Sequence, residues 1–202
     1  MSVIEKLAII SDTITKLMGF TVSNELIKPD YEEYMRTCAA QNADTSKVQA
    51  LLIPYIFERR LTPERKSIIE LYRENTKDLS KDENEILDCL EKSFSSVFEI
   101  GRCMSNGFEM YNLVNERMYK VLSLVKMNNF RGITPGQYAL CRIFPVKDDF
   151  YLLEVSNVLS SINKDEVYKY AIAKIIEKPE DAYEQNPKKL EQIEALVKNF
   201  GE

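Results

Sequence analysis

The sequence predicts an α+β protein: an N-terminal helical segment, a five-stranded antiparallel small barrel of SH3-like or related type, and C-terminal helices. Three observations predict this class. Apolar residues recur at helical spacing over the first 93 residues, five short β-prone runs with tight turns follow, and helix-capping patterns return after residue 160. We therefore expect segments at 1–93, 94–160 and 161–202, with the last packing on the rest to form one composite unit.

The first helix begins with Ser2 and Glu5, which have the spacing of a capping box. We expect it to end at Gly19, because glycine readily adopts the left-handed conformation that stops helices. A second helix is predicted over about 29–41, where Pro29 suits the first helical turn.

Three further helices are predicted before residue 93. The first contains Pro54, which should kink it because proline lacks an amide donor. The next should begin at Thr62-Pro63, a cap residue followed by proline at the first helical position. The last should begin with Ser80 and Glu83, which repeat the capping-box spacing.

The chain then changes to short runs rich in β-branched and aromatic residues. Asn106-Gly107 is a two-residue pattern typical of hairpins. Closure into a barrel is favoured over an open sheet because closure leaves no exposed strand edge. The predicted strands are about 97–104, 108–113, 117–124, 138–146 and 150–156.

Two helices are predicted after the barrel. Asn163 stands three residues before Glu166, a cap-like spacing, and Pro179 should end this helix. Asn186-Pro187 should open the last one.

The composition excludes several kinds of active site. The sequence has no histidine, which removes the commonest general base and zinc ligand. Its four cysteines are dispersed, as expected of thiols in a reducing compartment, and no glycine-rich phosphate loop occurs. We therefore expect no cofactor, no metal and no catalytic residue. Enzymatic use of carboxylates, lysine or tyrosine stays open as a third hypothesis.

No stretch approaches the roughly 18 apolar residues that span a bilayer. The N-terminal apolar run, Leu7 to Ile10, is too short for the core of a signal peptide. We expect a cytoplasmic protein without membrane insertion.

Charge is unevenly distributed. The formal net charge is −5, yet residues 94–159 carry seven Lys or Arg against six Asp or Glu. Arg117, Lys120, Lys126 and Arg131 follow one another closely, with Glu116 as the one acid beside them. They form the best candidate basic patch for an anionic partner, and an ordinary solvated face is the alternative.

The barrel segment is also rich in aromatic residues. A small barrel needs such bulk to fill its interior, so core packing is one interpretation and an exposed binding surface is the other. Tyrosine suits the rim better than phenylalanine because of its hydroxyl. Tyr111 and Tyr119 are therefore candidate partner-binding residues.

Several short strings resemble a known group of proteins: Arg60-Leu61-Thr62-Pro63-Glu64, Asn112-Leu113-Val114-Asn115-Glu116, and Asn186-Pro187-Lys188-Lys189-Leu190-Glu191. In this order they resemble a family of uncharacterised bacterial proteins, with cyanobacterial and actinobacterial members, in which a helical leader precedes a small β module. The resemblance spans about 60–200. It implies this architecture and no established activity.

Arg60 has two interpretations. Cations complement the carbonyls at a helix C-terminus, which would account for it locally. The resemblance implies an Arg-Leu pair at this position, and Arg60 could instead bridge the helical segment and the barrel as an interdomain contact.

The leading hypothesis is a non-enzymatic binding or adaptor protein that acts through the β module and has a protein partner. Association with nucleic acid or the ribosome through the basic patch is the alternative. The sequence leaves the partner and the oligomeric state open.

Overall fold

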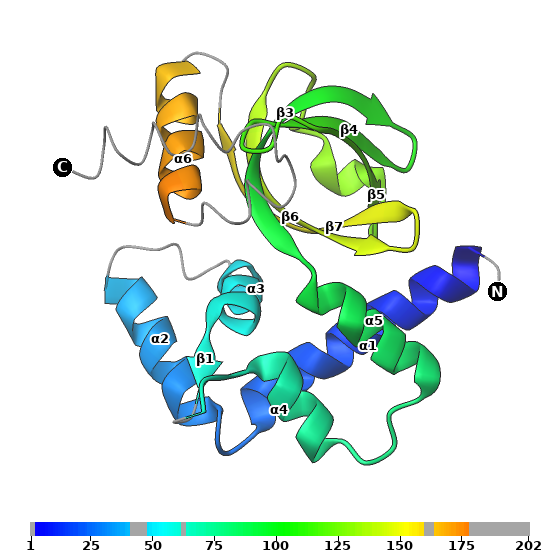
Figure 1. The fold of residues 1–202 in the computed structure, drawn as a ribbon, viewed down its shortest axis with the longest axis vertical. Coiled ribbons are helices and arrows are strands. Elements are labelled where there is room, and N and C mark those ends of the chain that lie inside the picture. Colours follow the sequence, from blue (N-terminus) through cyan, green and yellow to red (C-terminus); the bar gives the residue numbers. More distant parts are fainter. Residues whose placement is uncertain (1–2, 41–47, 62–63, 160–163, 178–202) are drawn as a thin grey trace. The chain divides into compact units, whose positions relative to one another are not determined.

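Figure 1 shows the fold in a computed structural model, which describes residues 3–40, 48–61, 64–159 and 164–177. The chain divides into two compact units between Ser93 and Phe94, and each is described by itself. The first is helical and the second contains a closed β-barrel, so the predicted α+β class is confirmed. The caps predicted at Ser2 and Asn163 and the helix predicted from Asn186 lie outside the described residues.

The helical unit packs its helices through apolar faces. Each helix contributes a buried side chain, namely Leu17, Tyr31, Ile56, Leu71 and Leu87 in chain order. The elements are α1 (Val3–Ser23), α2 (Lys28–Ala40), α3 (Val48–Glu58), β1 (Arg60–Leu61), β2 (Lys66–Ser67), α4 (Ile68–Asn75) and α5 (Lys81–Glu91).

Helix α1 does not stop at Gly19, as the sequence predicted, but continues to Ser23. Gly19 has no positive φ, and no heavy atom lies within 4 Å of the position a Cβ would take there. Neither conformation nor space therefore requires glycine at this point. The chain turns instead at Asn24, whose Oδ1 accepts a hydrogen bond from the Leu26 amide at 2.9 Å.

The predicted start of the next helix, at Thr62-Pro63, is also wrong. Those two residues lie outside the described part of the chain, but Lys66–Ser67 forms strand β2 and α4 begins only at Ile68. The Ser67 hydroxyl accepts from the Glu70 amide, and the Glu70 carboxylate accepts from the Ser67 amide at 2.6 Å. This reciprocal capping box fixes the start of α4. The same arrangement at Ser80 opens α5, as predicted.

A charged and aromatic contact joins α2 to the end of α3. Arg59 donates two hydrogen bonds to the Asp30 carboxylate, at 2.9 and 2.6 Å, and the Tyr55 hydroxyl donates a third at 3.0 Å. The Arg59 guanidinium holds the pKa of Asp30 below its usual value. Burial, followed by the hydrogen bond to Asp30, raises the pKa of Tyr55. The three side chains form a link between two helices.

The second unit contains five strands that close into a barrel in the order β3-β4-β5-β7-β6. Its inner face is a cluster of apolar side chains that includes Phe98, Phe108, Val121 and Ile143, all at most 1% exposed. The elements are β3 (Phe94–Met104), β4 (Gly107–Asn112), β5 (Met118–Ser123), the short 3-10 helix η2 (Met127–Phe130), β6 (Tyr138–Val146), β7 (Asp149–Leu159) and α6 (Lys164–Glu177).

The barrel is mixed rather than wholly antiparallel, which corrects one part of the prediction. β5 and β7 pair in parallel over three positions, from Val121 opposite Phe150 to Ser123 opposite Leu152. Every other neighbouring pair is antiparallel. Strand direction cannot alternate around a ring with an odd number of strands, so a closed five-stranded barrel must contain at least one parallel pair.

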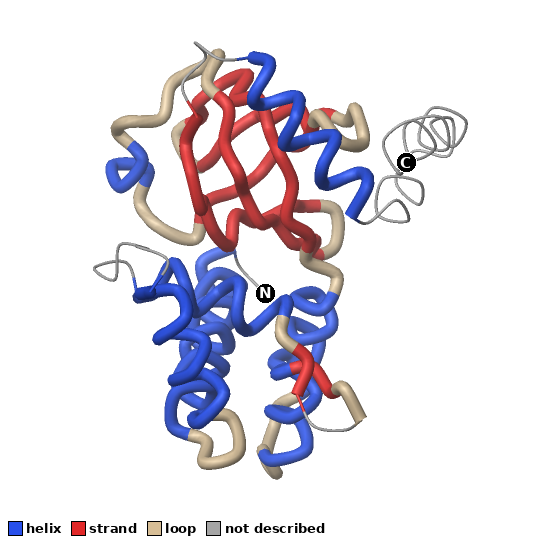
Figure 2. Tube along the Cα trace, turned by 90° about the vertical axis from the view of Figure 1, so that its left-hand side faces the viewer, coloured by secondary structure: helices blue, strands red, loops and turns tan. Residues whose placement is uncertain are grey.

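Helix α6 covers part of the outside of the barrel (Figures 1 and 2). Its Val167 and Ala171 are buried against Val97 of β3 and Tyr138 of β6. At the opposite, inner face, η2 places Phe130 edge-on to Phe108, with ring centroids 5.5 Å apart. The interior of the barrel is therefore filled by side chains.

Candidate functional site

The outer face of β3, β4 and β5 carries the candidate site. Side chains alternate between the two faces of a strand. On β5, Tyr119 and Val121 are buried in the barrel interior, whereas Met118 and Lys120 are exposed on the outside. The same alternation along β3 and β4 sets which of their residues share the outer face.

Strand register places the outward residues in two rows. In the first row Glu99 of β3 is opposite Tyr111 of β4, and Tyr111 is opposite Met118 of β5. Directly opposite side chains have Cβ atoms about 5 Å apart, so they can contact one another and a shared ligand.

The second row is built from charges. Arg102 of β3 is opposite Glu109 of β4, and Glu109 is opposite Lys120 of β5. Arg117 comes directly before Met118, in the loop that leads into β5. We call these residues together the outer-face patch: Glu99, Arg102, Glu109, Tyr111, Arg117, Met118 and Lys120.

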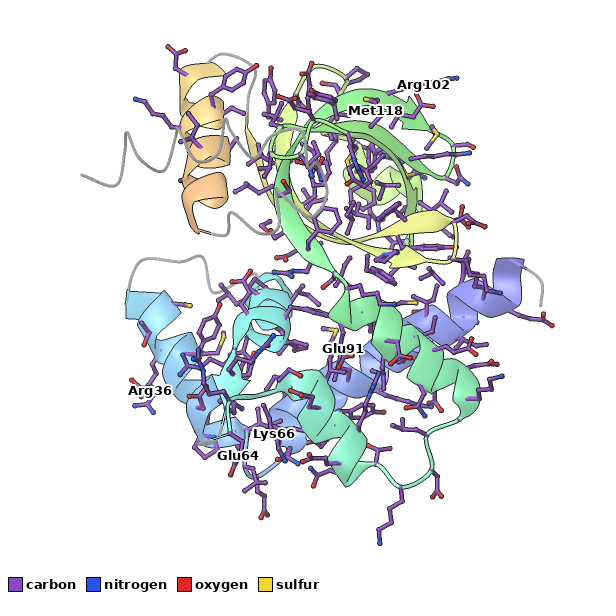
Figure 3. All side chains as sticks on the ribbon, viewed as in Figure 1. Arg36, Glu64, Lys66, Glu91, Arg102 and Met118 are labelled. Carbon is purple, nitrogen blue, oxygen red and sulfur yellow. The ribbon has the colours of Figure 1, made fainter. Side chains whose placement is uncertain are left out.

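Met118 is the most exposed apolar residue of the patch, at 62%. A β-bulge interrupts the register of β3 between Ile100 and Arg102 and leaves Gly101 as an extra residue. The Met118 methyl lies 3.9 Å from the position a Cβ on Gly101 would take, so the side chain reaches across β4 toward the bulge. Figure 3 shows Met118 and Arg102 at the outer surface of the barrel.

Tyr111 occupies the middle of the patch and is half-buried. Burial raises the pKa of its hydroxyl, and the carboxylates of Glu116 and Glu99 raise it further, so Tyr111 is neutral at physiological pH. Tyr168 of α6 is near enough to contribute to the same shift and is 52% exposed.

The exposed charge of the patch is mainly positive. Arg102, Arg117 and Lys120 are exposed, whereas Glu99 and Glu109 are partly buried between them. None of the three cations forms an ion pair with another described residue. They are therefore available to an outside partner.

The cations singled out from the sequence divide into two groups. Arg117 and Lys120 belong to the outer-face patch, whereas Lys126 and Arg131 flank η2 after the end of β5. The six residues of β5 lie between the two groups, and at about 3.3 Å each they span roughly 20 Å. A single ligand would have to be extended to reach all four.

The other two candidates lie elsewhere. Tyr119 is only 7% exposed and packs inside the barrel, so its assignment to a binding surface was wrong. The reason is the alternation of β5, which turns Tyr119 inward when Lys120 faces out. Arg60 lies in β1, and its guanidinium donates to the Arg59 carbonyl at 3.1 Å. That contact is within the helical unit, and the interdomain contact stays a prediction.

The described residues contain no group of three or more histidine, cysteine or acidic side chains placed to hold a metal ion. Within the same residues, no helix is long and apolar enough to cross a membrane. Cys141 is buried in the barrel, and burial raises the pKa of its thiol to about 12. Cys141 is therefore protonated at neutral pH and a poor nucleophile.

Residues 14–194 match a family of unknown function, DUF7986. The chain belongs to this family. The DUF7986 match begins in α1 and extends beyond α6, so it includes both units. The predicted membership of an uncharacterised family is confirmed. No curated protein and no solved structure matches the chain.

Four residues of the patch in this DUF7986 member were missed from the sequence: Glu99, Arg102, Glu109 and Met118. Arg102 and Met118 are the two of them that are exposed. Met118 is detectable in retrospect, because it stands two positions before Lys120 on a strand and must share its face. Arg102 is not detectable in this way. Regular alternation would turn it inward like Ile100, but the bulge at Gly101 reverses the alternation of β3 and turns Arg102 outward. Nothing in the sequence marks that bulge beyond the glycine itself.

Proposed function

We propose that this DUF7986 protein is a non-enzymatic binding or adaptor protein, and that its outer-face patch holds an acidic protein segment with an apolar anchor residue. One observation carries the proposal. An exposed methionine lies among three exposed cations that form no ion pair with any described residue.

The apolar part of the patch supports a protein partner. Met118 is flexible and polarisable, and such side chains adapt to the contours of a bound apolar group. Tyr111 beside it supplies a rigid ring with a polar end. Binding interfaces characteristically combine a small apolar centre of this kind with a polar rim. An anchor side chain would therefore contact Met118 and Tyr111.

The charged part of the patch supports an acidic partner. Arg117 adjoins Met118 in sequence, and Lys120 lies two residues further on the same face. Arg102 lies on the far side, next to the bulge that the Met118 methyl approaches. Carboxylates on either side of an apolar anchor would meet these cations, which favours association and sets the orientation of the segment.

The test is selection of peptides from a random 12-residue display library on the full chain. We expect enriched peptides to carry an apolar residue flanked by Asp or Glu. The Met118→Glu variant should weaken their binding about tenfold or more, because it removes the anchor contact and introduces a like charge. Fluorescence anisotropy with the best selected peptide gives the dissociation constants.

Leu26→Glu is the matched control. Leu26 is also an exposed apolar residue, at 72%, but belongs to the helical unit, and its replacement should leave peptide binding unchanged. Equal binding by Met118→Glu and the original chain would disprove the assignment of the surface. Self-association that Met118→Glu abolishes would identify a second copy as the occupant instead.

Nucleic-acid binding is the second candidate, and a different observation favours it. The stretch from Ser123 to Gln137 contains no acidic residue, and Lys126 and Arg131 are both exposed in it. Binding of a labelled single-stranded oligonucleotide should then fall steeply with salt, and Lys126→Ala with Arg131→Ala should reduce that slope. Binding that ignores salt would count against this candidate.

A further inference from the structure

The loop between β4 and β5, residues 113–117, leads directly into the outer-face patch. It ends in Arg117, and Met118 follows as the first residue of β5. Glu116 has a φ of 58°, a left-handed conformation that a residue other than glycine adopts at an energetic cost. The loop must therefore be held in shape by its surroundings.

Asn112, at the end of β4, holds the first half of the loop. It is 1% exposed, and its Oδ1 accepts hydrogen bonds from the Ser96 hydroxyl at 2.8 Å and from the Val114 amide at 2.8 Å. The Asn115 amide lies 3.3 Å from the same oxygen. One buried side-chain oxygen thus joins β3 and two loop amides.

Asn115 holds the second half. It is 2% exposed, and its Oδ1 accepts from the Arg117 amide at 3.1 Å. Its Nδ2 donates to the Tyr119 hydroxyl at 2.8 Å. The position of the Arg117 backbone therefore depends on the orientation of the Asn115 amide, and that orientation depends on Tyr119.

Tyr119 is fixed by the core of the barrel. Its ring meets Phe150 edge-on, with centroids 4.9 Å apart, and meets Phe98 edge-on at 6.0 Å. Only the hydroxyl has a polar function in this environment, and buried hydroxyls are almost always hydrogen-bonded. A phenylalanine would pack in the same place but could not accept the hydrogen bond from Asn115.

Building on the proposed function, we propose that Tyr119 and Asn115 are positioning residues that hold the loop in the shape that presents Arg117 and Met118 to the partner. Neither residue touches the partner. The barrel interior fixes the Tyr119 ring, the Tyr119 hydroxyl orients the Asn115 side chain, and Asn115 in turn holds the Arg117 amide.

The test compares Tyr119→Phe with the original chain by amide hydrogen exchange and by binding of the selected peptide. Tyr119→Phe keeps the ring and removes the hydrogen bond that Asn115 Nδ2 donates to the Tyr119 hydroxyl. We expect the Val114, Asn115 and Arg117 amides to exchange roughly tenfold faster or more, because a lost buried hydrogen bond destabilises the closed loop. The peptide should bind several-fold more weakly.

Asn115→Ala removes the hydrogen bond to Tyr119 and also the one that the Arg117 amide donates to Asn115 Oδ1. The double variant should exchange no faster in the loop than Asn115→Ala alone, because both changes remove one shared contact. Tyr72→Phe is the matched control: Tyr72 is equally buried but belongs to α4 of the helical unit, and its change should leave loop exchange and binding unaltered. Circular dichroism confirms that each variant folds.

Two results would overturn the positioning role. Unchanged loop exchange in Tyr119→Phe would show that the hydrogen bond does not hold the loop. Faster exchange with unchanged peptide affinity would show that the partner does not depend on loop shape, while the Met118→Glu result could still support the proposed surface. Failure of the library to yield any binding peptide would overturn both proposals, whatever the exchange data show.

Discussion

The two units use their charged residues differently. In the helical unit charges link neighbouring elements: Lys16 of α1 contacts Glu83 of α5 at 2.7 Å, and Arg59 contacts Asp30 of α2 at 2.6 Å. In the barrel unit Arg102, Arg117 and Lys120 form no ion pair with a described residue.

The difference follows from how each unit is built. Helices meet along surfaces whose edges are polar, so side chains from two helices can pair there. A closed barrel joins its strands by backbone hydrogen bonds and fills its interior with apolar groups, so it does not need Arg102, Arg117 and Lys120 to hold its strands together. In the helical unit, charge pairs therefore join helices, whereas Arg102, Arg117 and Lys120 on the barrel join no described elements.

The largest loss of stability is expected from Gly107→Ala. This change tests whether the barrel depends on the close approach of the β4 and β5 backbones at Gly107. A Cβ at Gly107 would lie 2.0 Å from the Val121 carbonyl oxygen, and a backbone atom in a central strand cannot move aside. We expect a loss of about 3 kcal/mol or more in the free energy of unfolding, measured by urea denaturation.

Gly132→Ala is the control for that change. Gly132 has no positive φ, and no heavy atom lies within 4 Å of its would-be Cβ, so stability should hardly change. Equal stability of the two variants would mean that β4 and β5 are not paired in the register described.

A smaller effect is expected from Asp30→Ala in the helical unit. The change leaves the Arg59 guanidinium without its carboxylate and takes the main acceptor from the Tyr55 hydroxyl, which belongs to a residue only 1% exposed. We expect a loss of about 2 kcal/mol on urea denaturation. Glu109→Ala on the barrel should cost less than about 0.5 kcal/mol. If Asp30→Ala and Glu109→Ala lowered the free energy of unfolding by similar amounts, charged side chains would not serve different purposes in the two units.

The smallest effect concerns the acid stability of the helical unit. The hydrogen bond from Lys16, with those from Ser80, lowers the pKa of Glu83 from 4.5 to about 2. Because the folded value is the lower one, ionised Glu83 stabilises the fold above pH 4.5, and this contribution disappears as the pH falls toward 2. The helical signal in circular dichroism should report the loss during acid titration.

Glu83→Gln separates this effect from helix capping. Glutamine can still complete the capping box but cannot ionise, so the variant should lose less stability between pH 4.5 and 2. Glu85→Gln changes an exposed carboxylate of the same helix and should keep the original acid dependence. An unchanged acid titration in Glu83→Gln would remove Lys16 and Glu83 from the set of stabilising contacts.

Local signals predicted most elements but not all of their ends. Ser80 and Glu83 marked the start of α5 correctly. Ser67 and Glu70 have the same spacing, yet Thr62-Pro63 competed with them as a start signal. The pairing of Lys66 with Leu61 decides between the two, because it keeps the chain extended as far as Ser67, which then caps α4.

The five strands and the closure of the barrel followed from the sequence alone, because short β-branched runs separated by turn residues have few other ways to bury one face. Alternation along β5 also places Met118 and Lys120 on one face and Tyr119 on the other. The tertiary structure decided three further points. It introduced a parallel pair, because an odd ring requires one. It added Arg102 to the patch, because a bulge reversed the alternation of β3. It also decided which face of β5 is the inner one, and this places Tyr119 in the core. Each of these depends on contacts between residues distant in sequence, which local patterns do not record.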